Sequence, residues 1–180
     1  MSNKTTCVIA DSSFYICFLD DIACPALLNL MLAGPFQFLI TRIVHDEIKA
    51  SENYLQIQTE RLEKLEEPFD ISKILMPFFG KDEASKGEHE IVAFSLILSK
   101  NDPDLIIILD DAQPRKILER HNPRLANNVY GTVGFVVSCH CDYTILQKRD
   151  VLGTIKIIGE SKFRVSGDII RRAESQVREC

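Results

Sequence analysis

The chain has 180 residues, which fits one domain of ordinary size or one domain with a short tail. Apolar residues make up 46% of it and charged residues 26%, a balance typical of a folded globular protein rather than a disordered or low-complexity one. The formal net charge of -5 argues against a generic nucleic-acid coat.

The first elements alternate between short β-branched runs and helical patterns. Thr6–Ala10 is predicted to be a strand, and Asp11 or Ser12 is expected to cap the helix that follows. Pro25–Leu32 predicts a second helix and Phe36–Ile40 a second strand. The chain is thus expected to begin as strand, helix, helix, strand.

A long helical stretch is expected next. Thr41 is predicted to cap a helix, and the helical periodicity that begins there is expected to continue until Pro68. Residues 71–80 contain Pro and Gly and fit either a loop or a short strand. A strongly apolar helix is then predicted to begin near Glu88.

The clearest strand is 105–109, a continuous apolar run between Asp-Pro-Asp and Asp-Asp, as expected for a strand buried on both faces. Residues 113–121 predict a helix, 127–130 a last short strand, and Gly131 with Thr132 the start of another apolar helix. Short strands separated by helices predict an α/β fold, a three-layer α/β/α sandwich around a mostly parallel sheet.

Five acidic residues fall near element ends in this topology. Asp11 follows the first strand and Asp110–Asp111 follows the buried strand, at the carboxyl ends where parallel sheets gather functional groups. Glu47 lies in the helix after the second strand, and Glu88 begins a later helix. Clustered carboxylates raise one another's pKa values, so such a cluster is costly unless cations neutralise it. Oxygen ligands of this kind select Mg²⁺ or Mn²⁺, and the matching chemistry is metal-assisted phosphodiester hydrolysis.

Each acid also has a simpler explanation by itself. Capping a helix would by itself explain Asp11. Glu47 can be a solvated helix residue, and the helix dipole favours Glu88 in a first turn regardless of function. A cap-plus-turn explanation covers one of Asp110 and Asp111 and leaves the other without a structural task. The combination therefore indicates a site more strongly than any single member does.

The charge is unevenly distributed along the chain. Residues 1–110 hold 9 Lys and Arg against 18 Asp and Glu, whereas residues 111–180 hold 12 against 8. An acidic first part and a basic last part can meet at a metal-dependent site where bases contact phosphates.

The apolar segments and the N-terminal residues indicate where the protein is located and whether its cysteines are reduced. The long uncharged windows 22–41 and 125–141 are interrupted by turn or polar residues, so no membrane span is expected. The polar start predicts no secretory signal, and a cytoplasmic location is expected. The six cysteines lie mostly in apolar segments and are expected to be reduced thiols.

An ordered set of segments resembles the PIN-domain nucleases. These segments are VIADSSFYI, TRIVHDEIKAS, GKDEASKGEHEIVAFSLI, LIIILDDAQPRKI and VYGTVGFVV. The chain is most similar to small prokaryotic PIN proteins, which are relatives of VapC-like toxins. The resemblance implies a PIN-like nuclease domain over 1–145 and a C-terminal helical extension over 146–180, packed on the domain or on a partner.

The resemblance also implies roles for the acids. Asp11, Glu47, Glu88 and Asp111 would hold Mg²⁺ or Mn²⁺, with Asp110 beside them as a further catalytic residue. Which of Asp110 and Asp111 is the principal ligand stays open.

Two further positions match the family pattern, and one departs from it. Thr132 matches a small hydroxyl residue beside the metal site, and Arg115 matches a basic residue that either contacts phosphate or is a surface charge. Leu109 stands where many relatives have Thr or Ser, so a hydroxyl group that would help to orient the metal is missing there.

The expected function is an endoribonuclease that hydrolyses RNA phosphodiester bonds, with the toxin of a toxin–antitoxin pair as its biological role. An antitoxin protein and a second copy of the chain are then the expected protein partners. The alternative is a PIN-like module that binds RNA or a protein without catalysis.

Overall fold

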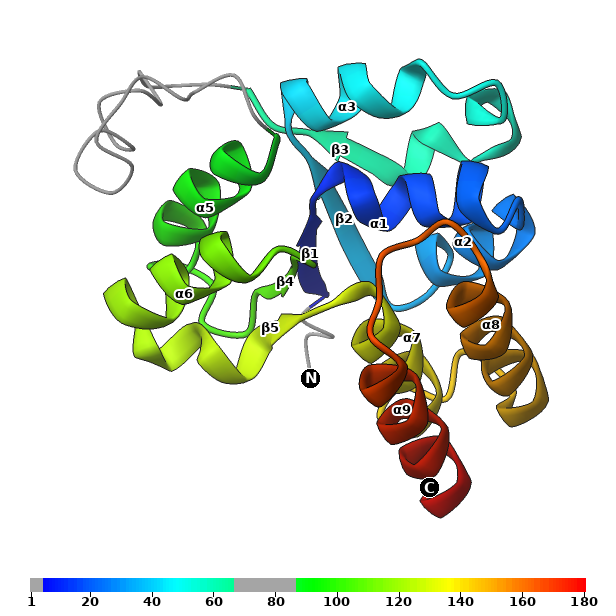
Figure 1. The fold of residues 1–180 in the computed structure, drawn as a ribbon. Helices are drawn as coiled ribbons and strands as arrows, with labels where there is room; N and C mark the ends of the chain where they lie inside the picture. Colours follow the sequence, from blue (N-terminus) through cyan, green and yellow to red (C-terminus); the bar gives the residue numbers. More distant parts are fainter. Residues whose placement is uncertain (1–4, 67–86) are drawn as a thin grey trace.

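The computed structural model describes residues 5–66 and 87–180. These residues form a five-stranded, all-parallel sheet with the strand order β3-β2-β1-β4-β5, flanked by helices (Figure 1). The predicted three-layer α/β/α sandwich is therefore confirmed. The strands are β1 (Thr6–Ala10), β2 (Phe36–Ile40), β3 (Leu62–Lys64), β4 (Ile106–Ile108) and β5 (Val129–Tyr130).

The register of the central strands sets the position of the candidate site. β1 lies between β2 and β4, and its last residue, Ala10, is paired with Ile108 of β4. The carboxyl ends of β1 and β4 are therefore side by side. Asp11 leaves β1 at this point, and its backbone N–H donates to the carbonyl oxygen of Ile108 at 3.1 Å.

Helices cover the sheet in the order that the sequence predicts for most of the chain. The α-helices are α1 (Ser12–Ile16), α2 (Pro25–Leu32), α3 (Arg42–Lys49), α5 (Gly87–Leu98), α6 (Ala112–His121), α7 (Thr132–Cys141), α8 (Lys148–Glu160) and α9 (Gly167–Glu179). A π-helical turn over Cys17–Asp21 extends α1, and 3₁₀ turns span Tyr54–Gln56, Thr59–Arg61 and Pro123–Asn128.

An aromatic cluster joins α1 and α7 to the sheet. Phe14 of α1 lies 6.2 Å from Phe38 of β2 and 5.8 Å from Phe135 of α7, measured between ring centroids, and all three side chains are fully buried. Aromatic pairs at such distances add stability beyond the area they bury. This cluster fixes α1, and so Asp11 at its start, against the sheet, while α5 and α6 lie together on the other side (Figure 1).

The prediction of one helical stretch from Thr41 to Pro68 is wrong. α3 ends at Lys49, and Leu62–Lys64 forms the edge strand β3, in which Leu62 is paired with Phe38. The spacing of apolar residues suggested a helix because it included Leu55, but that side chain is 90% exposed. Residues 71–80, for which a loop or a strand was expected, lie outside the described residues.

The C-terminal segment forms two helices, of which the sequence predicts one. Ser166 caps α9, since its Oγ accepts a hydrogen bond from the Ile169 N–H at 3.4 Å. α8 was not predicted, because its apolar positions face neighbouring helices that only the fold brings close. α8 and α9 pack against each other and against α7 (Figure 1).

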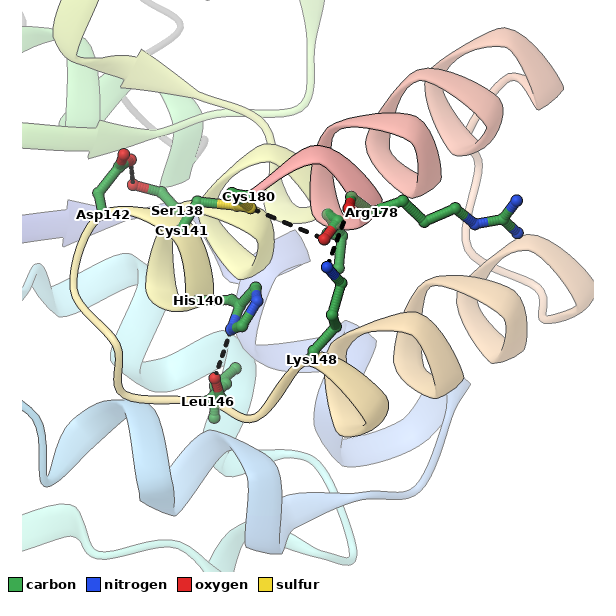
Figure 2. The surroundings of a disulfide bond; sticks show 9 residues. Ser138, His140, Cys141, Asp142, Leu146, Lys148, Arg178 and Cys180 are labelled. Atoms are coloured by element: carbon green, nitrogen blue, oxygen red, sulfur yellow. Dashed lines mark hydrogen bonds between the residues drawn. A yellow bond between two sulfur atoms is a disulfide. The ribbon is translucent and has the colours of Figure 1, made fainter.

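A disulfide bond links Cys141 at the end of α7 to Cys180 after α9, with their Cα atoms 5.6 Å apart (Figure 2). At the same end of α9, Lys148 Nζ donates to the Arg178 carbonyl at 2.9 Å. The prediction that all cysteines are reduced is therefore wrong for this pair. Their proximity arises from helix packing across 39 residues of chain and has no local signal.

Within residues 5–66 and 87–180, no helix combines the length and the apolar character that crossing a bilayer requires.

Candidate functional site

Asp11 is a buried acid at the carboxyl edge of the sheet. Only 3% of its surface is exposed, and its Oδ1 accepts a hydrogen bond from the Phe14 N–H at 3.2 Å, which caps α1. Burial and, to a smaller extent, the charge of Asp110 raise the pKa of Asp11 to about 8, against the opposing effect of hydrogen bonds from the Phe14 and Asp110 backbones. The capping role is real, but a cap alone does not explain a second carboxylate beside a buried one.

Asp110 is held by the start of α7. Its Oδ1 accepts from the Thr132 N–H at 2.9 Å, and its Oδ2 accepts from the Thr132 hydroxyl at 2.6 Å. Burial raises the pKa of Asp110, and the hydrogen bonds from Thr132 and the charge of Arg115 partly offset the rise. Thr132 therefore lies beside the acids, as the sequence indicated, and orients Asp110 through both oxygens.

Gly131 allows this close approach. A Cβ atom at this position would lie 3.0 Å from Asp110 Oδ1 and 3.7 Å from Arg115 Nη1. The Arg115 guanidinium also donates from Nη2 to the Val129 carbonyl at 3.2 Å. Arg115 thus braces the turn around Asp110, a positioning role that the sequence did not reveal, and a phosphate contact by this residue stays a prediction.

Asp111 occupies a different environment from Asp110. It is exposed at the N-cap position of α6, and its side chain forms no capping hydrogen bond. Both aspartates line a cleft of about 260 Å³. Among the charges that raise the pKa of Asp11, Asp110 has the largest effect and Asp111 a smaller one, so Asp110 is the more closely coupled partner.

The Glu47 carboxylate of α3 reaches the start of α5, where Glu88 is the second residue. A Cβ on Gly87 would be 2.9 Å from Glu47 Oε2, which places the Glu47 carboxylate against the residue before Glu88. Glu88 Oε1 is 3.7 Å from Nε2 of the buried His89. α3 packs against α1 and α5, and α5 packs against β1, so this pair is on elements adjacent to Asp11.

Glu90 has a structural role that sequence reasoning missed. It is fully buried, and its Oε2 accepts from the Ile43 N–H at 2.9 Å in the first turn of α3. Thr41 stands at the N-cap position, but its side chain makes no capping bond, so the predicted Thr41 cap is wrong in this respect. An acid from α5 supplies the acceptor instead, and it fixes α3 to α5 near Glu47. Glu88 and Glu90 lie in one turn of the predicted helix, and the sequence does not show which of them belongs to the site and which supports the fold. Only the packing of α5 against α3 assigns the structural role to Glu90.

The chemistry of Asp11 and Asp110 fits a hard divalent cation. The charge of the partly buried Asp110 opposes the ionisation of the buried Asp11, and a cation between the two carboxylates would relieve that repulsion. Mg²⁺ is commonly bound through one or two carboxylates with several waters. Tyr15, one turn after Asp11, is fully buried, and its hydroxyl has no hydrogen-bond partner in the described part of the chain.

The fit is centred on the aspartates. Among residues 5–66 and 87–180, no group of three or more His, Cys, Asp and Glu side chains is arranged to hold a metal ion. The structure brings Asp11, Asp110 and Asp111 to one edge of the sheet. It places Glu47 and Glu88 on the adjacent helices α3 and α5, and among the described residues these acids do not form one ligand group.

Comparison with protein-family models, with curated proteins and with solved structures gave no match.

Proposed function

We propose that this chain is a Mg²⁺- or Mn²⁺-dependent endoribonuclease whose central acids are Asp11 and Asp110. The observation that carries the proposal is the buried Asp11 beside Asp110 at the carboxyl edge of the two central strands. A parallel sheet places functional groups at this edge, and paired carboxylates there are costly without a counter-charge. The resemblance to PIN-domain nucleases also implies Asp11 as a ligand, but it names Asp111 as the second aspartate ligand and places Asp110 beside it.

Each residue has a defined task in this proposal. Asp11 and Asp110 hold the cation, which when bound activates water and stabilises the leaving oxygen of the phosphodiester. Thr132 fixes the orientation of the Asp110 carboxylate, because it donates a hydrogen bond to each of its two oxygens. Asp111 lies at the exposed wall of the cleft, where it can contact water or a second cation.

Glu47 and Glu88 complete the acidic edge in the proposal. Their place on α3 and α5, which pack against α1 and β1, suits hydrogen bonding to water around the cation. A toxin role, with an antitoxin and a second copy of the chain as partners, stays a proposal that the family resemblance alone supports.

A non-catalytic RNA- or protein-binding module is the second candidate. It is favoured by one observation, that the described residues contain no ready group of three metal-binding side chains. The buried Asp11–Asp110 pair counts against it, because a binding module has no need of two acids that destabilise each other.

An RNA cleavage assay separates the two candidates. We expect single-stranded RNA to be cut when Mn²⁺ or Mg²⁺ is present and to stay intact in a chelator. Asp11→Asn and Asp110→Asn should each lower the cleavage rate on the order of 100-fold, while Asn keeps the side-chain oxygen that caps or accepts. Glu119→Gln, which neutralises an exposed acid on α6, is the matched control and should cut normally.

Cleavage that survives both aspartate substitutions, or that persists in the chelator, would contradict the proposal. RNA that is bound but not cut, together with no Mn²⁺ binding by calorimetry, would favour the binding module.

A further inference from the structure

The loop between α8 and α9 reaches the acidic cleft. Lys162, Phe163 and Arg164 line the same 260 Å³ cleft as Asp110 and Asp111. The C-terminal extension therefore supplies one wall of the candidate site, although these residues are about 50 positions from the aspartates along the chain. Two positive side chains thus face an otherwise acidic edge.

The loop is anchored rather than loosely tethered. Ser161 Oγ donates to the Ile158 carbonyl at 2.8 Å and accepts from the Phe163 N–H at 3.1 Å. Phe163 is half-buried and packs against the hydrophobic core. Phe163 anchors the loop because its side chain packs against the core. Its neighbours Lys162 and Arg164 are exposed on either side of this anchor.

Both cations are available to a ligand. Lys162 and Arg164 are exposed, and neither forms a hydrogen bond or an ion pair with the described residues. Burial raises the pKa of Asp21, which lines the same cleft, and the charge of Lys162 partly opposes that rise. Lys162 therefore lines the cleft within the range of the Asp21 charge.

A polyanion that binds at this acidic cleft needs positive groups such as Lys162 and Arg164 beside the acids. The acids hold a cation, but they repel a phosphate chain that approaches them, and fixed positive groups beside them offset that repulsion. Arg presents several donors to phosphate oxygens, and Lys acts as a compact positive charge. The basic last part of the sequence thus meets its acidic first part at this cleft.

We propose that Lys162 and Arg164 form a phosphate-binding arm that holds a single RNA strand across the acidic cleft, next to the scissile bond. The arm rests on the proposed nuclease function, because RNA is taken as the strand it holds. It assigns to the C-terminal extension a direct part in substrate binding.

The test measures binding and cleavage separately. A short fluorescent single-stranded RNA is titrated with the full chain in a chelator, where it is expected to stay intact, at several salt concentrations. Cleavage in Mg²⁺ is followed in a separate assay. The double variant K162A/R164A should weaken RNA binding and reduce the slope of log affinity against log salt by about 1.4, the value for two lost phosphate contacts. Its Mn²⁺ affinity, measured by calorimetry without RNA, should equal that of the wild type.

The matched control is K156A/R172A. It removes the same charges from exposed positions on α8 and α9 that do not line the cleft, so it should keep the wild-type slope. An unchanged slope in K162A/R164A, an equal fall in the control, or a changed Mn²⁺ affinity would overturn the arm. Arm-dependent RNA binding without any cleavage would support the arm and overturn the nuclease function, whereas cleavage with arm-independent binding would do the reverse.

Discussion

The substitution Asp11→Asn keeps the size of residue 11 and an oxygen that can cap α1, but it removes a group whose ionisation the fold opposes. Asp11 is 3% exposed and is coupled to Asp110, and its pKa is raised from 3.8 to about 8. Between these two values the folded state holds a proton that the unfolded state has lost. The free energy of unfolding of the metal-free wild type therefore falls as the pH rises through this window.

The size of this effect follows from the pKa difference. One pKa unit corresponds to about 1.4 kcal/mol, so a shift from 3.8 to about 8 amounts to a loss on the order of 6 kcal/mol at the top of the window. The full stabilisation is present below the unfolded pKa, and the loss is complete above about pH 8. Asp11→Asn lacks this dependence, so its stability relative to the wild type should grow with pH.

Urea unfolding in a chelator, at a series of pH values from about 5 to about 8.5, measures this difference. Glu119→Gln is the control, since it neutralises an exposed acid and should follow the wild type. Added Mn²⁺ should restore the stability of the wild type at high pH and leave Asp11→Asn nearly unchanged. A stability difference between Asp11→Asn and the wild type that is constant with pH would refute the claim that Asp11 is buried against a second carboxylate.

Three other changes have defined outcomes. Thr132→Val removes the hydroxyl donor to Asp110 and should lower the free energy of unfolding by about 1.5–3 kcal/mol, whereas Thr132→Ser should be close to wild type; equal urea midpoints for the two would contradict the bond. Gly131→Ala places a Cβ 3.0 Å from Asp110 Oδ1, so calorimetry should show weaker Mn²⁺ binding while circular dichroism shows a retained fold; unchanged affinity would show that Asp110 is not a ligand. Reduction of the disulfide, or Cys180→Ser, should cost up to about 4 kcal/mol, the entropy of a loop closed across 39 residues; urea curves that coincide with and without reductant would contradict a disulfide in the folded chain.

The strands that could be predicted from the sequence are those whose burial gives them a continuous apolar composition. The apolar runs of β1, β2 and β4 are surrounded by other chain on both faces, so their composition alone marks them. β3 is a three-residue edge strand in which two residues are exposed, and it has no such signature. Its position depends on pairing with β2, which is a contact between distant residues.

The candidate site was predictable in part for the same reason. Because parallel strands end at one edge, Asp11 and Asp110 could be placed together from their positions after two apolar runs. The choice between Asp110 and Asp111 could not be made, since it depends on how the start of α7 brings Thr132 to one of them. The sequence favoured Asp111 as a ligand, and the geometry gives more weight to Asp110.

The contacts that the C-terminal extension makes with the rest of the chain could not be predicted from local sequence patterns. α9 was expected as a helix, but nothing local shows that its end meets Cys141 or that the loop before it reaches the acids. Such contacts arise when separate helices pack against each other. In a single sequence, the polar residues that make these contacts cannot be distinguished from ordinary surface residues. The basic excess after residue 110 was the one compositional hint.

The most direct test of the central claim is a crystal of the wild-type chain soaked in Mn²⁺ and measured for anomalous scattering. The account predicts an anomalous peak within bonding distance of the Asp11 and Asp110 carboxylates, at roughly 2.0–2.2 Å as for small hard cations. The same soak of Asp11→Asn should lose that peak. Manganese that binds elsewhere, or a wild-type crystal in which the two aspartates share only a proton, would contradict a metal-dependent site at this edge of the sheet.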